Sequence, residues 1–359
     1  MKDRINALLS HSAPLKAREI AKELGLDRSE VSSFLHNHPG QYRQDSEYRW
    51  LLAKERELEL TLLNGWVNAE AFENVLKAAG PILDGPSEAI RIVFPSTCKT
   101  MIDCNARLLA LVNQLASHGK EATLDFTDAK GTLTYLDRAG FFDLLHKDVT
   151  VLPNKPVRSA AKRHKGRSDT LVELGAVDPK SDNARLIEQL TDTFVQQSSA
   201  DYKIAAFTIF SELIGNVSEH SESRLHGYAG LQKYKGNLKH IQTVVTDSGV
   251  GIASTLRSTL KTHHPELFRR FGATSVESDM GLVVAAMSKG GISRFGGGRG
   301  LGFKSSRELA VKFNASFSVR QEEFCLRFEY RNGQLMGVTR QPQLSRLMGT
   351  HICFDFYVA

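Results

Sequence analysis

The order of hydrophobic and polar positions along the chain predicts helices and strands that differ from one region to the next. Near the N-terminus, apolar residues recur at helical spacing in short segments, and alternating stretches around a polar turn follow. In the middle, short apolar runs typical of strands alternate with longer helical patterns. The C-terminal part begins with helical patterns and ends in strand-like runs. The chain is therefore expected to be an α+β protein with several domains.

The N-terminal pattern predicts a helix, then two helices separated by a turn at Gly25 and Leu26, and finally a hairpin over residues 42–51. Asp27 is placed to cap the third helix. The inward positions of that helix are Val31, Phe34 and Leu35. Its outer face is polar and consists of Arg28, Ser29, Ser32 and Ser33.

The middle of the chain is expected to begin with a charged helical connector over residues 54–79, because Leu58, Leu62 and Leu63 form an apolar stripe. A small α/β unit should follow. Its predicted strands are 89–94, 122–126 and 149–153, and its predicted helices are 99–118 and a segment within 131–145.

The most basic run of the chain, residues 155–167, lacks apolar periodicity, which favours a loop or mobile linker. Two interpretations of this run stay open. It contacts nucleic-acid phosphate or an acidic partner, or it is a solvated linker.

The C-terminal pattern predicts two helices, followed by strands around a long intervening segment. The helices are expected over residues 182–199 and 202–219. The predicted strands are 227–233, 240–247, 317–320, 324–330 and 351–358. Residues 253–297 are too many for a structureless connector, which favours a functional element.

Composition agrees with a water-soluble globular chain of 359 residues, since 41% of them are hydrophobic and 24% charged. No apolar run approaches the ~20 residues that span a bilayer, and no apolar signal-peptide core follows the N-terminus, so a cytoplasmic protein without membrane contact is expected. The net charge of +6 and the pI near 9.0 permit contact with nucleic acid but do not require it. The four cysteines lack zinc-like spacing.

Three motifs carry candidate chemistry, and two of them lie on the predicted helix over 202–219 and after the predicted strand over 240–247. Glu212 and Asn216 are four residues apart, so they share one face of the predicted helix over 202–219. A carboxylate there can orient or deprotonate water, and an amide oxygen one turn later can bind Mg²⁺. Asp247 ends an apolar strand, where it can accept a hydrogen bond from the exocyclic amine of adenine, and Gly249 and Gly251 permit close backbone approach.

The third motif is the glycine-rich run 296–302, which precedes a helix-like segment over 303–313. Backbone amides at such a helix start suit phosphate. Cations flank these glycines, and any of them can neutralise a terminal phosphate. They are Lys289, Arg294 and Arg299, of which Arg299 lies inside the run.

These three motifs, in this order, resemble the conserved boxes of the GHKL (Bergerat-fold) ATPase superfamily, over roughly residues 185–358. The resemblance implies ATP and Mg²⁺ as cofactors, Glu212 as general base, Asn216 as Mg²⁺ ligand and Asp247 as adenine acceptor. It implies that the segment before Gly296 is an ATP lid. It also implies that phosphates are contacted by Gly298, Gly300 and Gly302.

Two looser resemblances concern the remainder of the chain. The N-terminal helices and hairpin resemble a winged helix-turn-helix, in which Arg28, Ser29, Ser32 and Ser33 would enter the major groove of DNA. Arg43 and Arg49 would then lie on phosphate, although a protein-binding winged helix is equally compatible with so thin a basic face. Residues 122–145 resemble a STAS-like domain, where Arg138 stands in the place of the serine that STAS partners of serine kinases phosphorylate.

The expected domains are a winged helix over 1–52, a helical connector over 53–84, a STAS-like α/β domain with the basic linker over 85–180, and a Bergerat α/β sandwich over 181–359. Possible partners are DNA through the winged helix, a protein through the STAS-like domain, and a second copy of the chain. This mixture suits a bacterial regulator, by architecture alone.

Four functions compete. A histidine kinase would need a phosphoaccepting histidine on an upstream dimerising helix, and this setting is lacking for His36, His38, His118, His146 and His164. A serine/threonine kinase of the anti-sigma type would lack its substrate serine in cis. A purely structural protein is opposed by the intact motifs. The preferred hypothesis is an ATP-binding and hydrolysing regulator whose nucleotide state controls contact with DNA or a protein partner.

Overall fold

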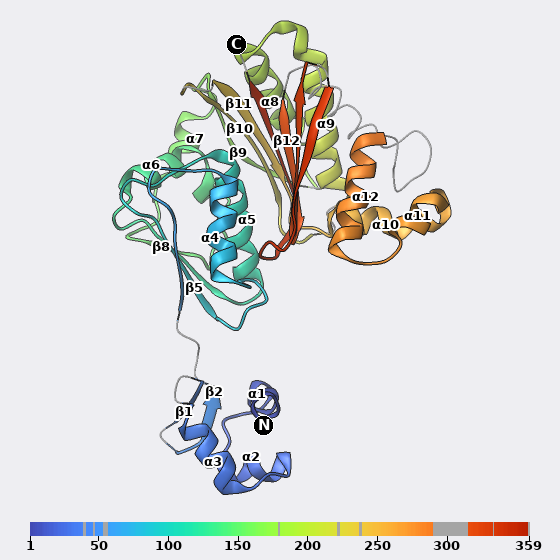
Figure 1. Ribbon diagram of the computed structural model, residues 1–359. Coiled ribbons are helices and arrows are strands. Elements are labelled where there is room, and N and C mark those ends of the chain that lie inside the picture. The colour runs from blue at the N-terminus through green and yellow to red at the C-terminus, as the bar shows by residue number, and fades with distance from the viewer. Residues whose placement is uncertain are drawn as a thin grey trace. The chain divides into compact units, whose positions relative to one another are not determined.

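The computed structural model describes residues 1–38, 41–45, 47–52, 57–178, 180–220, 223–236, 239–289, 315–332 and 334–357 (Figure 1). The chain divides into two compact units. The first contains residues 1–58 and 86–90, and the second contains residues 59–85 and 91–359. The expected first boundary at residue 52 lies six residues before the end of the first segment.

The N-terminal unit contains three helices and a two-stranded antiparallel hairpin, in the order that the sequence predicts. The helices are α1 (Lys2–His11), α2 (Ala17–Leu24) and α3 (Arg28–His36), and the strands are β1 (Tyr42–Gln44) and β2 (Trp50–Leu52). Asp27 caps α3 as predicted, because its Oδ1 accepts hydrogen bonds from the backbone of Ser29 and Glu30 at 2.7 and 3.2 Å. The core includes Ile5, Ile20, Val31, Leu35 and Trp50, while Phe34 packs on it partly buried.

The middle of the chain forms a four-stranded sheet of order β3-β5-β7-β8. Its strands are β3 (Leu58–Thr61), β5 (Ala89–Val93), β7 (Glu121–Asp125) and β8 (Thr150–Leu152). Two further short strands of the same region, β4 (Trp66–Val67) and β6 (Lys99–Thr100), pair with each other in parallel. The helices are α4 (Ala69–Ala79), α5 (Ile102–Ser117), α6 (Lys130–Arg138) and α7 (Ala160–His164), and a 3-10 turn, η1, spans Phe141–Asp143. Residues 59–85 and 91–170 are called the middle part below.

The prediction of a helix over residues 54–79 is wrong for its first half. β3 and β4 occupy residues that the apolar stripe assigned to a helix, and α4 begins only at Ala69. Leu60 and Leu62 are buried, while Leu63 is 49% exposed. Buried positions therefore recur at every second residue, as in a strand. Glutamate, arginine and leucine favour helices, but tertiary context overrides that weak preference here.

The basic run 155–167 was predicted to be a loop, and this is also wrong in part. Ser159 caps α7 by accepting a hydrogen bond from the backbone of Lys162 at 3.0 Å. Asp137 accepts a second bond from the backbone of Ala160 at 3.1 Å, and Ala161 is buried. The run therefore packs locally against α6 while most of its cationic side chains stay exposed.

The C-terminal part is built on a seven-stranded antiparallel sheet of order β14-β13-β12-β15-β11-β10-β9. Its strands are β9 (Leu171–Val177), β10 (Gly227–Tyr234), β11 (His240–Thr246), β12 (Ser316–Glu322), β13 (Phe324–Arg331), β14 (Gln334–Gln341) and β15 (Leu347–Tyr357). The edge strands β9 and β14 were not predicted, and β9 precedes the expected domain boundary at residue 181.

One face of the large sheet is covered by α8 (Ala184–Gln197), α9 (Lys203–His220) and α12 (Val276–Lys289). An apolar core lies between these helices and the sheet. Every second residue of a strand points into it, such as Val245 on β11, Phe317 on β12 and Phe354 on β15. This face is the one that the helical and strand periodicities predict.

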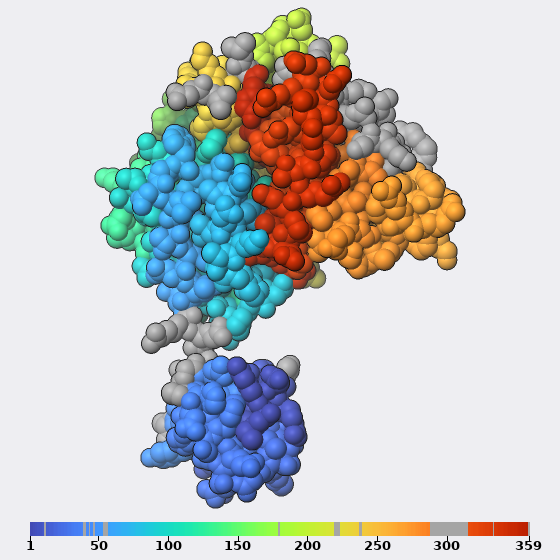
Figure 2. All heavy atoms as spheres, viewed as in Figure 1, coloured from blue at the N-terminus to red at the C-terminus, as the bar shows by residue number. Residues whose placement is uncertain are grey.

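The opposite face of the sheet is polar and buried, and α5 of the middle part covers it (Figure 1). Every residue of α5 from Ile102 to Leu115 is buried. Figure 2 shows the blue residues of the middle part directly against the red C-terminal strands. Because α5 also packs on β7, it forms a shared layer between the two sheets.

Candidate functional site

Asp247 lies directly after β11, at the end of a strand whose last residue, Thr246, pairs with His351 of β15. Its side chain is buried, and its Oδ1 accepts a hydrogen bond of 2.7 Å from the backbone of Gly249. Its own backbone N–H donates to the carbonyl of Thr350 at 2.9 Å. Burial raises the pKa of Asp247 to about 6, against the opposing effect of hydrogen bonds from Gly249 and Thr350.

Two glycines with positive φ lie in the backbone beside Asp247. Gly251 has a φ of +77°, and a Cβ on it would lie 3.2 Å from Nε2 of Gln321. Gly349 has a φ of +90°, and a Cβ there would lie 2.1 Å from the carbonyl oxygen of Asp247. Both positions therefore favour glycine, Gly251 for its positive φ and Gly349 also because a Cβ would overlap the Asp247 carbonyl.

Thr350 belongs to this site and was missed as a site residue from the sequence. Its hydroxyl accepts a hydrogen bond of 2.9 Å from Nε2 of Gln321, and Thr350 also contacts Asp247 through its side chain. The signal that could have found it is the Gly349-Thr350 pair at the start of a strand that neighbours β11.

Glu212 and Asn216 lie on α9, one turn apart, as the spacing predicts. The buried face of this helix, which includes Phe210, Leu213 and Val217, packs in the same core as Val245 of β11. Both polar side chains are half-buried beside that face. Helix α9, which carries Glu212 and Asn216, therefore packs on the sheet that contains β11, the strand that precedes Asp247.

Residues 202–351 match the family of histidine kinase-, DNA gyrase B-, and HSP90-like ATPases. The C-terminal part thus contains a GHKL domain. The match supports ATP binding and covers the site residues on α9 and after β11. No curated protein shows significant similarity to the chain.

The described residues of the GHKL domain fit the base end of ATP. A buried carboxylate follows a strand, a hydroxyl lies next to it, and two glycines with positive φ, Gly251 and Gly349, belong to the adjoining backbone. The residues expected at the phosphates, Gly298, Arg299, Gly300 and Gly302, lie outside the described residues, as does Arg294. The side chain of Lys289 is also outside them.

The described part of the expected lid is helical. It consists of α10 (Gly251–His263), α11 (Pro265–Phe271) and α12. These helices share a small apolar cluster that includes Leu260, Phe271 and Leu282. Arg257 joins α10 to α12 through an ion pair with Asp279 and donates to the carbonyl of Phe271 at 3.1 Å. The segment between Gly251 and Lys289 is therefore a packed substructure rather than a loop.

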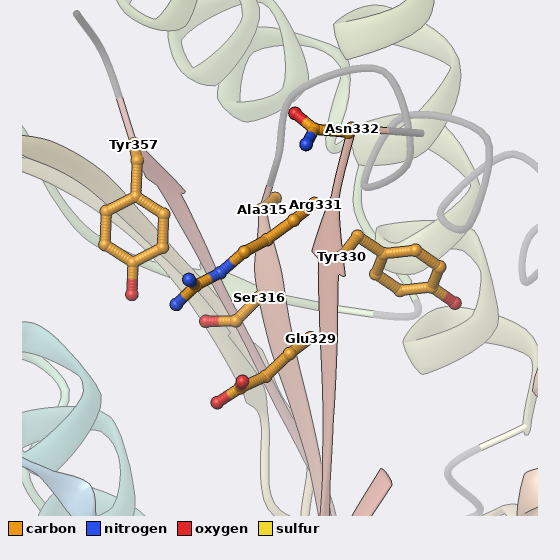
Figure 3. Close-up of a pocket in the computed structure, with 7 residues that line it drawn as sticks. All are labelled: Ala315, Ser316, Glu329, Tyr330, Arg331, Asn332 and Tyr357. Atoms are coloured by element: carbon orange, nitrogen blue, oxygen red, sulfur yellow. The ribbon is translucent and has the colours of Figure 1, made fainter. Parts of the chain in front are cut away.

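A surface cavity lies at a different place in this domain (Figure 3). It is lined by Ala315, Ser316, Glu329, Tyr330, Arg331, Asn332 and Tyr357. Tyr357 ends β15 seven residues after Thr350, about 23 Å along an extended strand. Figure 3 shows the ring of Tyr330 on the side of the strands away from Ser316 and Glu329. This cavity is separate from the surroundings of Asp247.

The candidate DNA-contacting residues of the N-terminal unit differ in accessibility. Arg28, Ser29 and Ser33 are exposed on α3, and Ser32 is half-buried. Arg49, expected on phosphate, forms ion pairs with Asp45 at 2.9 Å and with Glu47 at 3.2 Å. The side chain of Arg43 lies outside the described residues.

In the middle part, Arg138, which the STAS resemblance places at the phosphoacceptor position, forms an ion pair with Glu173 of β9. It also donates to the carbonyl of His164 at 3.2 Å. The neighbouring Gly140 has a φ of +84°, and a Cβ there would lie 3.0 Å from the carbonyl of Leu174. Strand β9 therefore packs directly against this turn.

Within the ranges that the structure describes, no three His, Cys, Asp or Glu side chains converge as a metal site. The four cysteines are buried and unbonded. Nor does any described helix have the length and apolar character needed to cross a bilayer.

Proposed function

We propose that the chain binds Mg-ATP in its GHKL domain and hydrolyses it, and that the nucleotide state controls contact with DNA or a protein partner. The observation that carries the proposal is the buried carboxylate of Asp247, held after β11 between Gly251 and Thr350, within the segment that matches the ATPase family.

Asp247 would accept a hydrogen bond from the exocyclic amine of adenine. One of its oxygens already accepts from Gly249, which fixes the orientation of the carboxylate. The adjacent Thr350 hydroxyl supplies a second polar group.

Asn216 would bind Mg²⁺ through its amide oxygen, since this cation takes few protein ligands and retains phosphate oxygens and water. Glu212, one turn earlier on α9, would orient the attacking water. The backbone amides of Gly298, Gly300 and Gly302, with the guanidinium of Arg299, would bind the phosphates.

Control of a partner is the regulatory half of the proposal. The N-terminal unit has the helix order and hairpin of a winged helix-turn-helix, and α3 exposes Arg28, Ser29 and Ser33. This arrangement supports DNA or protein contact through α3. A homodimer formed or rearranged by ATP, and a protein partner of the STAS-like middle part, are further parts of the proposal.

A kinase activity toward its own middle part is less favoured. The acceptor position holds Arg138, which is paired with Glu173 and has no hydroxyl to phosphorylate. A kinase acting on a separate protein remains the alternative function, and one assay separates it from an ATPase.

The test is turnover of γ-labelled ATP by the full chain with Mg²⁺, comparing the wild type with Glu212→Ala. Released phosphate that is lost in the variant, while ATP still binds, supports a hydrolysing switch with Glu212 as base. Label on this protein or on an added partner supports a kinase. Unchanged phosphate release in Glu212→Ala contradicts the role of Glu212, and absence of ATP binding by the wild type contradicts the whole proposal.

A further inference from the structure

The segment that carries Gly349 and Thr350 is held by residues of the middle part. Ser345 donates hydrogen bonds to the carbonyls of Leu76 and Gly80, at 2.9 Å each, beside the end of α4. Three residues later, Met348 is held by Gln114 of α5. The backbone that leads into the base site thus depends on contacts from outside the GHKL domain.

Gln114 makes the most direct of these contacts. Its side chain is fully buried. Nε2 donates to the carbonyl of Met348 at 3.0 Å, and Oε1 accepts from the backbone N–H of Met348 at 2.9 Å. Nε2 also donates to the hydroxyl of Ser248 at 2.8 Å. One amide therefore bridges the turn after β11 and the start of β15.

Those two bridged segments are the ones that form the surroundings of Asp247. Ser248 follows it in sequence, and Met348 precedes Gly349, on which a Cβ would lie 2.1 Å from the Asp247 carbonyl oxygen. The hydrogen bond from Asp247 to the Thr350 carbonyl joins the same two segments. A change in their separation would move the Asp247 carboxylate relative to Thr350.

The pleat of the sheet explains why this support comes from the opposite face. Val245 on β11 and Ile352 on β15 point into the core beneath α9, while Thr246 and His351 lie on the face of α5. Asp247 and Thr350 continue the α9 side. Gln114 approaches the same backbone from the other side, so it supports the site without occupying the space of the base.

We propose that Gln114, in the middle part, is a positioning residue for the base site of the GHKL domain. It holds Ser248 and Met348 so that Asp247 and Thr350 face the adenine amine together. The inference rests on the proposed ATP binding. It makes the middle part a structural component of the nucleotide site, through which a partner of the middle part can change base affinity.

The test compares Gln114→Met with Asn113→Leu in the full chain. Methionine keeps the length and packing of Gln114 but removes all three hydrogen bonds. Asn113 is the matched control because it is the neighbouring buried amide on α5. It bonds Tyr228 at 2.6 Å, the Leu144 carbonyl at 2.9 Å and the His146 backbone at 2.8 Å, and none of these lies at the base site.

The measured quantity is the ratio of affinities for ATP and for purine riboside triphosphate, which lacks the 6-amino group. Wild type and Asn113→Leu should prefer ATP to the same degree, even if Asn113→Leu melts at a lower temperature. Gln114→Met should reduce that preference about tenfold, equivalent to one misplaced hydrogen bond of about 1.4 kcal/mol. A purely structural role would change both affinities together and leave the ratio intact.

Ser248→Ala provides a second variant if Gln114→Met does not fold. It removes only the 2.8 Å bond from Gln114 and should reduce the preference about threefold. An unchanged ratio in a folded Gln114→Met protein, or in Ser248→Ala, overturns the inference while leaving ATP binding intact. A wild type without preference for ATP overturns the proposed base site instead.

Discussion

Replacement of Glu73 by alanine tests how strongly the two sheets of the second unit are joined. Glu73, on α4, forms ion pairs with Arg107 of α5 at 2.8 Å and with Arg320 of β12 at 3.0 Å. The exposed fractions of the three side chains are 3%, 5% and 0%. Burial alone would raise the pKa of Glu73, but the two guanidinium groups more than offset this and lower it.

The expected loss follows from what remains after the change. Glu73→Ala leaves two guanidinium groups buried without their carboxylate, and breaking one partner of a buried pair costs about 3–5 kcal/mol. Arg320 keeps its bonds to the carbonyls of Leu347 at 2.8 Å and Glu322 at 2.5 Å, which satisfy donors but do not neutralise its charge. We therefore expect a loss of about 4 kcal/mol in the free energy of unfolding.

The assay is urea unfolding of the full chain, followed by a signal from the second unit. Glu70→Ala is the matched control, because Glu70 is an exposed residue in the first turn of the same helix. It should change the free energy by less than about 0.5 kcal/mol. A loss below about 1 kcal/mol for Glu73→Ala would refute the reasoning, since it would mean that water reaches Arg107 and Arg320.

Two further predictions concern the base site. ATP affinity should be constant above pH 7 and fall as the pH drops below 6, because the pKa of Asp247 is raised to about 6 and its protonated carboxyl is a weaker acceptor for the adenine amine than the ionised form. Calorimetric titration with ATP at several pH values checks this. The Asp247→Asn variant cannot titrate at this position, so it should bind ATP more weakly and its affinity should depend less on pH below 6. Gly349→Ala should reduce ATP affinity and cost about 1–3 kcal/mol of stability, because its Cβ would lie 2.1 Å from the Asp247 carbonyl at a φ of +90°. Gly337→Ala on β14, whose Cβ meets no atom within 4 Å, should be nearly neutral in the same melting and binding assays.

The places of Glu212, Asn216 and Asp247 on a helix and after a strand were predictable because the signals are local. Glu212 and Asn216 share a helix face by spacing alone, and Asp247 directly follows a strand that contains Ile241, Val244 and Val245. The N-terminal elements were predictable for a similar reason, since Asp27 and Gly25 limit their helices. These signals lie within a few residues of one another and do not depend on the rest of the fold.

The contacts that complete the base site had no such signal. Gln114 reaches Ser248 across 134 positions and Met348 across 234. On a helical pattern, polar residues on α5 such as Arg107, Asn113 and Gln114 suggest a solvent face, yet all three are buried. Their burial is explained only by the packing of α5 on a polar face of the large sheet, whose strands lie far from α5 in sequence.

The polar character of that sheet face argues that the middle part and the GHKL domain function as one body. An exposed polar face would suit a GHKL domain that stands alone, because it would be solvated. Here Gln242 is buried, and its side chain accepts from the backbone of Asp103 at 3.2 Å while donating to Asp355 at 2.8 Å. If α5 separated fully from the sheet, such groups would be hydrated. A partial shift would instead leave some of them buried without hydrogen-bond partners. The interface therefore disfavours partial separation, and a displacement of α5 would also displace the backbone beside Asp247 that Gln114 holds.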